Sequence, residues 1–459
     1  MAGIVVEGAL SNVEAQDVEA RLESVIDKLS KTQELLARQR RVLLPAQNAM
    51  LYYGDAPLAA DRAEGSYLWD VEGNRYLDFF GGILTVSVGH ANPQVVEATE
   101  RQARQLGHTS TLYLNEVTIE VAEKIAALTP GRLERSFFTT SGTEANEMAV
   151  LAARSFTGNR DVIALRHAYA GRSTAMMSVT AHSTWRLGGV FDGTVKHVRS
   201  PNLYRMPEGM SEATYLDFLV EDLEEFIATC TDGSIAAFMA EPIQGVGGFT
   251  VVPLEYFRRI EPIVREAGGI LIIDEVQTGW GRTGGSWCAI EHWGVDPDVM
   301  TFAKGIANGA PVGCTVMTPE VAESIRGLTL STFGGNPVSM AQTLATLEYI
   351  ERNELWRNAE AMGHALRSRL EAMQQRFPFI GDVRGMGLMQ ALEMVVPASK
   401  TPSANVANTF VAAARTNGLL LGKGGRYGNV IRIAPMLDVT GDEIEEGCRA
   451  IEQALAEVG

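Results

Sequence analysis

Apolar and polar residues follow two different periods along the chain, and each period predicts a different kind of element. Residues 12–41 carry an apolar residue every three or four positions among charged ones, which predicts one amphipathic helix that ends before Pro45. Its apolar stripe consists of Val18, Leu22, Val25, Leu29 and Leu36. A helix outside the main body must bury such a stripe, and a second subunit could provide the surface. Gly65–Asp78 alternates instead around a Glu-Gly-Asn turn, which predicts a β-hairpin.

The middle of the chain is a series of short apolar runs separated by helical patterns. The runs are Ser136–Thr139, Val162–Leu165, Ile235–Ala240, Gly269–Ile273, Val299–Phe302 and Val312–Met317. Helical patterns such as Glu144–Arg154 and Leu254–Ala267 lie between several of them. Apolar runs that alternate with helices are typical of a mostly parallel sheet covered by helices on both faces, so the predicted fold class is α/β.

The pattern changes again after Pro337, where the chain is largely helical to about Phe377. Short strands are then predicted at Ile380–Val383, Met389–Met394 and Val430–Ile433, followed by a final helix from Asp442 to Val458. The predicted organisation is therefore an N-terminal helical arm (residues 1–65), a large α/β domain (66–335) and a small C-terminal α+β domain (336–459).

Composition and charge narrow the possible functions. The 459 residues are 46% hydrophobic and 21% charged, which excludes a disordered chain and allows a sizeable core. The formal net charge of −17 argues against a nucleic-acid-binding surface. No apolar run approaches the roughly 18 residues that span a bilayer, and the acidic N-terminus lacks the features of a signal peptide. We therefore expect a cytoplasmic protein, and its four widely spaced cysteines are expected to be buried, reduced thiols rather than zinc ligands.

Polar residues that follow the predicted strands are the candidates for chemistry, because ligands bind at the carboxyl ends of the strands in doubly wound sheets. The first group is the turn at positions 140–146, Thr-Ser-Gly-Thr-Glu-Ala-Asn, which joins a strand to a helix. Its exposed backbone N–H groups at the positive end of a helix would favour an anion such as phosphate. Simple N-capping by Thr140 or Ser141 explains the same residues equally well.

The second candidate is Asp274, which ends a fully apolar run. A buried unpaired carboxylate is costly, so a cationic or metal partner is expected. Strand alternation places Asp274 and Val276 on one side and Glu275 on the other, which favours a flat ligand that touches the first two. A structural ion pair is the alternative, and we prefer it for Glu275. A magnesium site would need a second carboxylate at a suitable spacing, which the sequence does not offer, so no metal is expected.

The third candidate is Lys304, one of only seven lysines among 39 basic residues. It follows the apolar run Val299–Phe302, where partial desolvation would lower the pKa of the amine and make the neutral form available as a nucleophile. The alternative is a lysine that extends to solvent, which is usual for lysines in general. A phosphate turn, a carboxylate and a lysine are together the groups that pyridoxal phosphate needs.

A series of motifs from about Tyr67 to the C-terminus resembles the class III (subgroup II) aminotransferases, which are pyridoxal-phosphate enzymes of fold type I. The motifs are Tyr76–Ile83, Ser141–Asn146, Ala168–Arg172, Glu241–Gly245, Asp274–Gly279, Ala303–Gly305, Ser331–Pro337 and Ile431–Pro435. Within the class the chain is most similar to alanine–glyoxylate aminotransferases of the second type and to ω-amino acid:pyruvate aminotransferases. One departure is Ala170, which follows Tyr169 where many members of the family have histidine.

The resemblance implies how the chain binds pyridoxal 5'-phosphate. Lys304 would form the Schiff base and, once displaced by substrate, would move a proton between substrate and cofactor. Asp274 would pair with the ring nitrogen, Val276 and Tyr169 would cover the two ring faces, and Gln277 would reach the ring hydroxyl.

The same resemblance implies an assembly with shared active sites. Ser141, Gly142 and Thr143 would hold the cofactor phosphate together with Thr332 of the neighbouring subunit. A homodimer follows from this arrangement, and the pairing of two dimers into a tetramer stays open.

Glu241 and Arg432 resemble the substrate gate of the family. The planar guanidinium of Arg432 suits an α-carboxylate, and Glu241 would neutralise it when a donor without an α-carboxylate enters. A permanent structural ion pair is the alternative interpretation.

These residues lead to one main hypothesis and two rivals. The main hypothesis is an aminotransferase that moves an amino group from an ω- or β-amino acid, an amine or alanine to pyruvate or glyoxylate. The first rival keeps the cofactor but changes the outcome to that of a decarboxylase, an aminomutase or an amino-alcohol phosphate lyase. The second is a non-catalytic binding or assembly protein that uses the N-terminal helix as its working surface.

Overall fold

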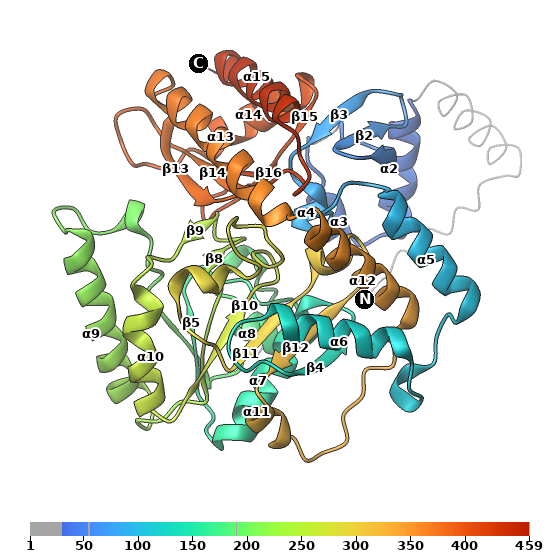
Figure 1. Ribbon diagram of the computed structural model, residues 1–459. Helices are drawn as coiled ribbons and strands as arrows, with labels where there is room; N and C mark the ends of the chain where they lie inside the picture. The colour runs from blue at the N-terminus through green and yellow to red at the C-terminus, as the bar shows by residue number, and fades with distance from the viewer. Residues whose placement is uncertain (1–29, 54–55, 190, 459) are drawn as a thin grey trace, which may run out of the picture. The chain divides into compact units, whose positions relative to one another are not determined.

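The structure is a computed structural model that describes residues 30–53, 56–189 and 191–458 (Figure 1). It divides into two compact units, residues 1–63 with 67–76 and residues 64–66 with 77–459, as far as these are described. The predicted boundaries at residues 65 and 335 stay predictions.

In the first unit, the predicted N-terminal helix is described only in its last part, as α2 (Lys31–Val42). The residues before Ser30, and with them most of the predicted apolar stripe, lie outside the described residues. Ser30 begins the helix with a capping box, in which its Oγ accepts from the Gln33 N–H while the Gln33 side chain accepts from the Ser30 N–H. Thr32 donates from its N–H and its hydroxyl to the Glu72 carboxylate, at 3.0 and 2.8 Å, which ties α2 to the hairpin.

The predicted hairpin is confirmed by β2 (Tyr67–Asp70) and β3 (Arg75–Asp78). Asp70 stabilises the turn, because its carboxylate accepts from the Asn74 N–H at 2.8 Å and from the Glu72 N–H at 3.1 Å. The Tyr76 hydroxyl donates to the same carboxylate at 2.9 Å. A short side chain that accepts from the backbone of its own turn explains why the chain reverses here.

The second unit is built on a seven-stranded sheet with the order β4-β12-β11-β10-β7-β5-β6. The strands are β4 (Arg135–Thr139), β5 (Val162–Leu165), β6 (Val195–Val198), β7 (Ala237–Ala240), β10 (Ile270–Asp274), β11 (Val299–Phe302) and β12 (Gly313–Met317). All six predicted runs are therefore strands of one sheet. β12 runs antiparallel to both of its neighbours, whereas the pairs on the other side of β11 are all parallel, so the sheet is mostly parallel as expected.

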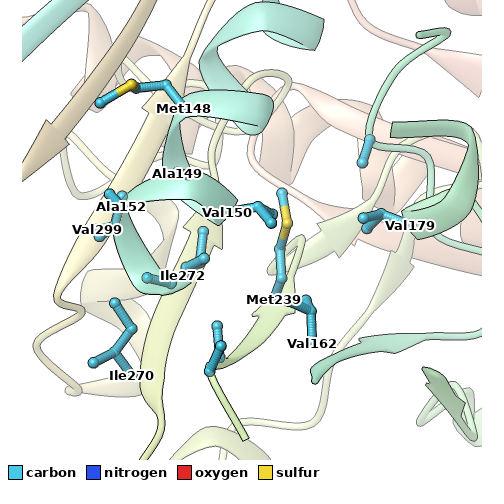
Figure 2. Close-up of a cluster of buried hydrophobic side chains, with 14 of the residues drawn as sticks. Met148, Ala149, Val150, Ala152, Val162, Val179, Met239, Ile270, Ile272 and Val299 are labelled. Carbon is cyan, nitrogen blue, oxygen red and sulfur yellow. The ribbon is translucent and has the colours of Figure 1, made fainter. Parts of the chain in front are cut away.

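One face of this sheet is covered by α7 (Gly142–Thr157), the helix that follows β4. Alternate residues of the central strands point towards it and join one buried cluster (Figure 2). The cluster includes Ala149 and Ala152 of α7, Val162, Met239, Ile270, Ile272 and Val299 of the strands, and Val179 of α8 (Thr174–Val179). Small residues on α7 let the helix lie close to the strands, and its N-terminus begins where β4 ends.

The next residues along the strands point to the opposite face, where α10 (Tyr256–Glu266) packs beside α9 (Glu212–Cys230) (Figure 1). The ring of Phe238, between Ala237 and Met239 on β7, lies 6.4 Å from the ring of Tyr256. The central strands are thus buried on both faces. This explains why their sequences are continuous apolar runs rather than alternating ones.

The C-terminal part contains a second, antiparallel sheet of order β13-β14-β17-β16. Its strands are β13 (Ile380–Met386), β14 (Met389–Met394), β16 (Gly422–Gly424) and β17 (Val430–Ile433), and the helices around it are α12 (Pro337–Arg352), α13 (Leu355–Arg376), α14 (Ala404–Thr416) and α15 (Gly441–Val458). The three predicted strands and the final helix are present. The other elements are α3 (Pro45–Ala49), β1 (Ala60–Glu64), α4 (Gly81–Leu84), α5 (Pro93–Gln105), α6 (Glu116–Leu128), β8 (Ile243–Gln244), β9 (Thr250–Val251), α11 (Pro319–Glu323) and β15 (Leu419–Leu420), with several short 3₁₀ turns.

Two predictions from composition can be compared with the described residues. No helix among them is long and apolar enough to cross a membrane. Three of the four cysteines are buried, free thiols, but Cys230 at the end of α9 is exposed, so the prediction that all four are buried is wrong for it. Cys230 continues the helical spacing of the buried residues Leu223 and Ile227, but it is the last residue of α9, so its exposure comes with the end of the helix.

Candidate active site

The turn between β4 and α7 has both the capping and the anion-binding features that its sequence suggested. Ser141 is the N-cap of α7 and its Oγ accepts from the Glu144 N–H at 3.3 Å, while the Glu144 carboxylate accepts from the N–H and the hydroxyl of Thr140 at 2.8 and 2.6 Å. The N–H groups of Gly142 and Thr143 make no recorded hydrogen bond to a described residue. Two unused donors at the N-terminus of a 16-residue helix therefore remain for an anion.

Asp274 lies at the carboxyl end of β10 with only 5% of its surface exposed. Its Oδ2 accepts from the Asn146 side-chain amide at 2.7 Å and its Oδ1 accepts from the Val276 N–H at 2.9 Å. Burial raises the pKa of this carboxyl, and the hydrogen bonds from Val276 and Asn146, with the charge of Lys304, oppose the rise. Both hydrogen-bond donors are neutral, and the cationic partner expected from the sequence acts through charge, as Lys304.

Asn146 is a residue whose role the sequence did not reveal. It lies in the first turns of α7, on the face that covers β10 and β11, and its amide donates to Asp274 and to the Ala170 carbonyl at 2.8 Å. Its carbonyl oxygen accepts from the Thr301 hydroxyl at 2.6 Å. Because Asp274 and Thr301 are paired residues of adjacent strands, a single amide contacts both. These contacts fix the Asn146 amide and, through it, the Asp274 carboxylate.

Lys304 follows β11, the strand next to β10, and its backbone has a positive φ of 48°. Such a conformation is unusual for a residue with a side chain and occurs often at functional sites. Burial lowers the pKa of the amine to about 8, partly opposed by the negative charges of Asp274 and Glu241, while Arg432 lowers it further. The amine has no hydrogen bond or ion pair recorded to a described residue. A buried amine near neutrality is a good nucleophile and proton carrier.

Glu241 follows β7 and is held by backbone groups rather than by a cation. Its Oε1 accepts from the Tyr169 N–H at 3.1 Å and its Oε2 accepts from the Gly245 N–H at 2.8 Å. Burial raises the pKa of this carboxyl, and the nearby charge of Asp274 raises it further. The ion pairs recorded between described residues do not include one between Glu241 and Arg432, which the alternative interpretation of a permanent pair would require.

Arg432 lies on β17, with 5% of its surface exposed. Its Nη2 donates to the Lys423 carbonyl at 2.9 Å, and its guanidinium carbon lies 4.8 Å from the ring centre of Phe80 and 5.7 Å from that of Phe249. Aromatic rings on a guanidinium stabilise its charge and restrict its orientation. The charge of Arg432 also lowers the pKa of Lys304, so the two side chains lie within electrostatic range of each other.

The remaining candidates differ in how well the structure supports their placement. Tyr169 is half-buried and packs edge-on against Trp185, with the ring centres 5.4 Å apart. A Cβ on Gly142 would lie 3.1 Å from Val276, so the phosphate turn and Val276 are in contact. Gln277 is buried, and its Oε1 has no hydrogen-bond partner among the described residues. Thr332 is exposed, and no contact with the other candidates is recorded in this single chain.

Together these residues fit a pyridoxal phosphate site. The unused N–H groups of Gly142 and Thr143 suit a phosphate, the unpaired Gln277 oxygen suits a hydroxyl donor, and Asp274 and Lys304 suit a protonated ring nitrogen and an aldehyde. Among the described residues, no group of three or more histidine, cysteine, aspartate or glutamate side chains could hold a metal ion.

Comparison with known proteins decides the family. The family model described as aminotransferase class-III matches residues 52–455. The chain belongs to the class III aminotransferases. It is 39% identical over 426 residues to alanine–glyoxylate aminotransferase 2 homolog 2, mitochondrial, of Arabidopsis thaliana, a match that covers 92% of this chain and 87% of the relative.

Two solved structures are similar to this aminotransferase over nearly their whole length. One is a thermostable (S)-enantioselective ω-transaminase from Thermomicrobium roseum, with a TM-score of 0.85, 33% identity and coverage of 94% of this chain and 99% of the other. The other is a phospholyase from Arthrobacter in complex with phosphoethanolamine, with a TM-score of 0.85, 31% identity and coverage of 92% and 99%.

The family settles the fold, the class of enzyme and the cofactor. The aminotransferase has the fold-type I α/β architecture and depends on pyridoxal 5'-phosphate, and its substrates are an amino donor and a keto acid.

The predicted ion pair of Glu275 is wrong, because its carboxylate accepts from the Thr278 hydroxyl and from the Ile290 N–H. Since Glu275 points away from Asp274, this network holds the loop after β10 and lies outside the candidate site.

Proposed function

We propose that this aminotransferase transfers an amino group from an ω- or β-amino acid, an amine or alanine to pyruvate or glyoxylate. The observation that carries the proposal is the joint placement of Lys304, Asp274, Glu241 and Arg432, whose charges influence one another at the ends of β7, β10, β11 and on β17. The similarity to an alanine–glyoxylate aminotransferase and to an ω-transaminase supports this range of donors and acceptors.

Each side chain then has a defined task. Bound pyridoxal phosphate supplies an aldehyde that condenses with amines and a ring that withdraws electrons from the substrate. Lys304 would hold the cofactor aldehyde through its amine and would carry the proton at Nζ, for which a pKa near 8 is suitable. Asp274 stabilises a positive charge on the ring nitrogen, while Gly142, Thr143 and Ser141 bind the phosphate. Tyr169 and Val276 cover the ring, and Gln277 accepts from its hydroxyl.

Arg432 and Glu241 provide for two kinds of substrate at one site. Arg432 binds the carboxylate of the keto acid bidentately, held against Phe80 and Phe249. Glu241 is anchored by two backbone N–H groups, and we infer that it turns towards Arg432 when the donor has no α-carboxylate. A Glu241→Gln variant should lose more activity with an amine donor than with alanine, and equal losses would contradict the gate.

Replacement of the nucleophile tests the proposal most directly. Lys304→Ala should lose both the visible absorbance of the covalently bound cofactor and transamination, with kcat reduced by roughly 10³-fold or more, because nucleophile and proton carrier are removed together. Absorbance spectra and a donor–acceptor panel measure the two effects. Lys196→Ala is the matched control, since Lys196 lies 3.5 Å from Asp161 at the edge of the sheet, and it should retain both. Unchanged activity in Lys304→Ala would refute the mechanism.

A phosphate lyase is the second candidate, favoured by the 31% identity to the Arthrobacter phospholyase. The two reactions differ when a donor is supplied without a keto acid. An aminotransferase then stops after one half-turnover, whereas a lyase continues to release phosphate from an amino-alcohol phosphate. Sustained phosphate release from phosphoethanolamine would replace the proposed function.

We also propose a homodimer in which Thr332 completes the partner's phosphate site, and possible association into a tetramer. The exposure of Thr332 and of its neighbour Phe333 supports this, because a second chain would cover both. The mass in solution tests the assembly, and a monomeric active enzyme would contradict it.

Cytoplasmic location stays a prediction from the sequence. The Arabidopsis relative is named as mitochondrial, so cell fractionation is the test of where this enzyme is found.

A further inference from the structure

A second concentration of positive charge lies outside the candidate active site. A cavity of about 310 Å³ is lined by five arginines, Arg166, Arg199, Arg205, Arg384 and Arg426, and by one carboxylate, Glu393. None of the residues proposed to bind the cofactor or the substrate lines it. Its size is at the lower end of the range for small-molecule sites. The whole chain has a net charge of −17, so this local excess of cations is contrary to the overall charge.

The inner wall of this arginine cavity is fixed by Glu393, which is buried on β14. Its Oε2 accepts from Arg384 Nη1 at 2.7 Å and its Oε1 accepts from Arg205 Nε at 3.0 Å. Arg384 also donates from Nε to the Gly248 carbonyl at 2.9 Å. Arg384 Nη1 also donates to Asp382 Oδ2 at 2.8 Å, so two carboxylates balance the two guanidinium groups and hold them as fixed N–H donors at the wall.

The other three arginines are exposed and are not neutralised. Arg166, Arg199 and Arg426 form no ion pair with any residue that the structure describes, although Arg199 and Arg426 lie over the rings of Phe218 and Tyr427 at 5.3 and 5.1 Å. His167 also lines the cavity, and its pKa is lowered to about 4. The largest cause is burial, and the positive charge of Arg426 is the next. His167 is therefore neutral, and the arginines supply the cationic character.

We propose that the arginine cavity is a binding site for a small anion with at least two negative charges, such as a phosphorylated metabolite, distinct from the cofactor phosphate site. Guanidinium groups bind phosphate oxygens through paired N–H donors, and several of them around one cavity satisfy several oxygens at once. A multiply charged anion would offset the repulsion among the three exposed arginines, whose charges no described carboxylate balances. A neutral or singly charged ligand would leave most of that repulsion in place.

The cavity is separate from the active site but shares a backbone segment with it. Gly247 lines the cavity, while Gly245, two residues earlier, donates to Glu241. Gly425 also lines the cavity and donates from its N–H to the Val246 carbonyl at 2.9 Å. A ligand bound among the arginines would therefore contact the same segment without occupying the substrate position, so it should bind together with substrate.

The test uses the holoenzyme, saturated with pyridoxal phosphate, and inorganic pyrophosphate as the probe, with isothermal titration calorimetry at constant ionic strength. Arg199→Gln and Arg426→Gln should each raise the Kd for pyrophosphate about tenfold or more, the usual effect of removing a charge-assisted hydrogen bond. Both side chains are exposed and unpaired with carboxylates among the described residues, so the variants should fold. Arg449→Gln, which removes an exposed arginine of α15 that does not line the cavity, should leave the Kd unchanged.

Two further measurements decide whether the site is distinct. Pyrophosphate binding should persist at a saturating keto acid concentration, and the visible absorbance of the bound cofactor should not decrease during the titration. Competition with the keto acid, or loss of the cofactor, would assign the anion to the active site and overturn the proposal. An undetectable affinity in the wild type, or equal affinities in wild type, Arg199→Gln and Arg426→Gln, would also overturn it.

Discussion

The end of β10 carries two adjacent buried carboxylates that point in opposite directions and differ in their surroundings. Asp274 faces α7, where Asn146 and the Val276 N–H donate to it. Glu275 faces the other way and accepts from the Thr278 hydroxyl and the Ile290 N–H within its own loop. Burial raises the pKa of both groups. Burial and a raised pKa are therefore insufficient to identify a catalytic carboxylate.

The difference lies in what each carboxylate can still contact. Glu275 is enclosed by the loop that it stabilises, at 1% exposure. Asp274 lies within electrostatic range of Lys304 and Glu241, beside the turn with the two unused N–H donors. The position next to a nucleophile and an anion-binding turn, rather than the pKa, distinguishes the functional group. Variants of Asp274 should therefore affect catalysis, whereas variants of Glu275 should affect stability.

The largest expected effect is on catalysis at Asp274. Asp274→Asn should lower kcat by roughly 10²–10⁴-fold, because removal of one partner of a buried charge pair costs about 3–5 kcal/mol and each 1.36 kcal/mol is a factor of ten in rate. The amide retains the size of the side chain, so the loss measures charge rather than packing. Glu275→Gln is the matched comparison and should keep kcat within a fewfold range. Similar decreases of kcat in both variants, measured by steady-state kinetics, would show that the two carboxylates do not differ in catalytic importance.

The second effect concerns stability at Glu275. Burial raises its pKa from 4.5 to about 7, so the folded state holds a proton that the unfolded state loses first as the pH increases. The stability from this group is complete below pH 4.5 and is lost as the pH rises to about 7, by roughly 3 kcal/mol at most. Glu275→Gln does not titrate, so its apparent melting temperature should fall less than that of the wild type over this range. If the melting temperatures of the two proteins changed equally over these pH values, the raised pKa of Glu275 would be contradicted.

The sequence predicts the strands of the sheet well, since those buried on both faces are continuous apolar runs, and β5 and β11 have the predicted bounds. It misses β6, where Lys196 and His197 interrupt the pattern at the sheet edge. It also cannot assign β12 its antiparallel direction, because an apolar run contains no information about direction.

The candidate site shows the same division between local and long-range information. Lys304 and Asp274 could be predicted because each directly follows an apolar run. The contacts of Asn146 could not, because its partners Asp274 and Thr301 are 128 and 155 residues away and meet it only through strand register. Strand alternation was the available signal. Asp274 and Thr301 each come two residues after a residue that faces α7, so their side chains point to the same face.

The smallest expected effect tests whether this long-range network positions Asp274. Thr301→Val removes the hydroxyl that donates to Asn146 and retains the shape of the side chain. The Asn146 amide then loses one of its three hydrogen bonds, and we expect kcat to fall about two- to fivefold, in line with about 1 kcal/mol for one hydrogen bond. The acid limb of the pH–rate profile should move to higher pH, because a less ordered Asn146 opposes the raised pKa of Asp274 less well.

Thr315→Val provides the control for this variant. Thr315 is as fully buried as Thr301 and also donates to α7, but to the backbone carbonyl of Ala145 at 2.7 Å rather than to Asn146. Thr315→Val should lower the melting temperature about as much as Thr301→Val does, but it should not move the pH–rate profile. If both threonine variants move the profile equally, then Asn146 acts only through the position of the helix, and the specific contact with Asp274 has no separate role.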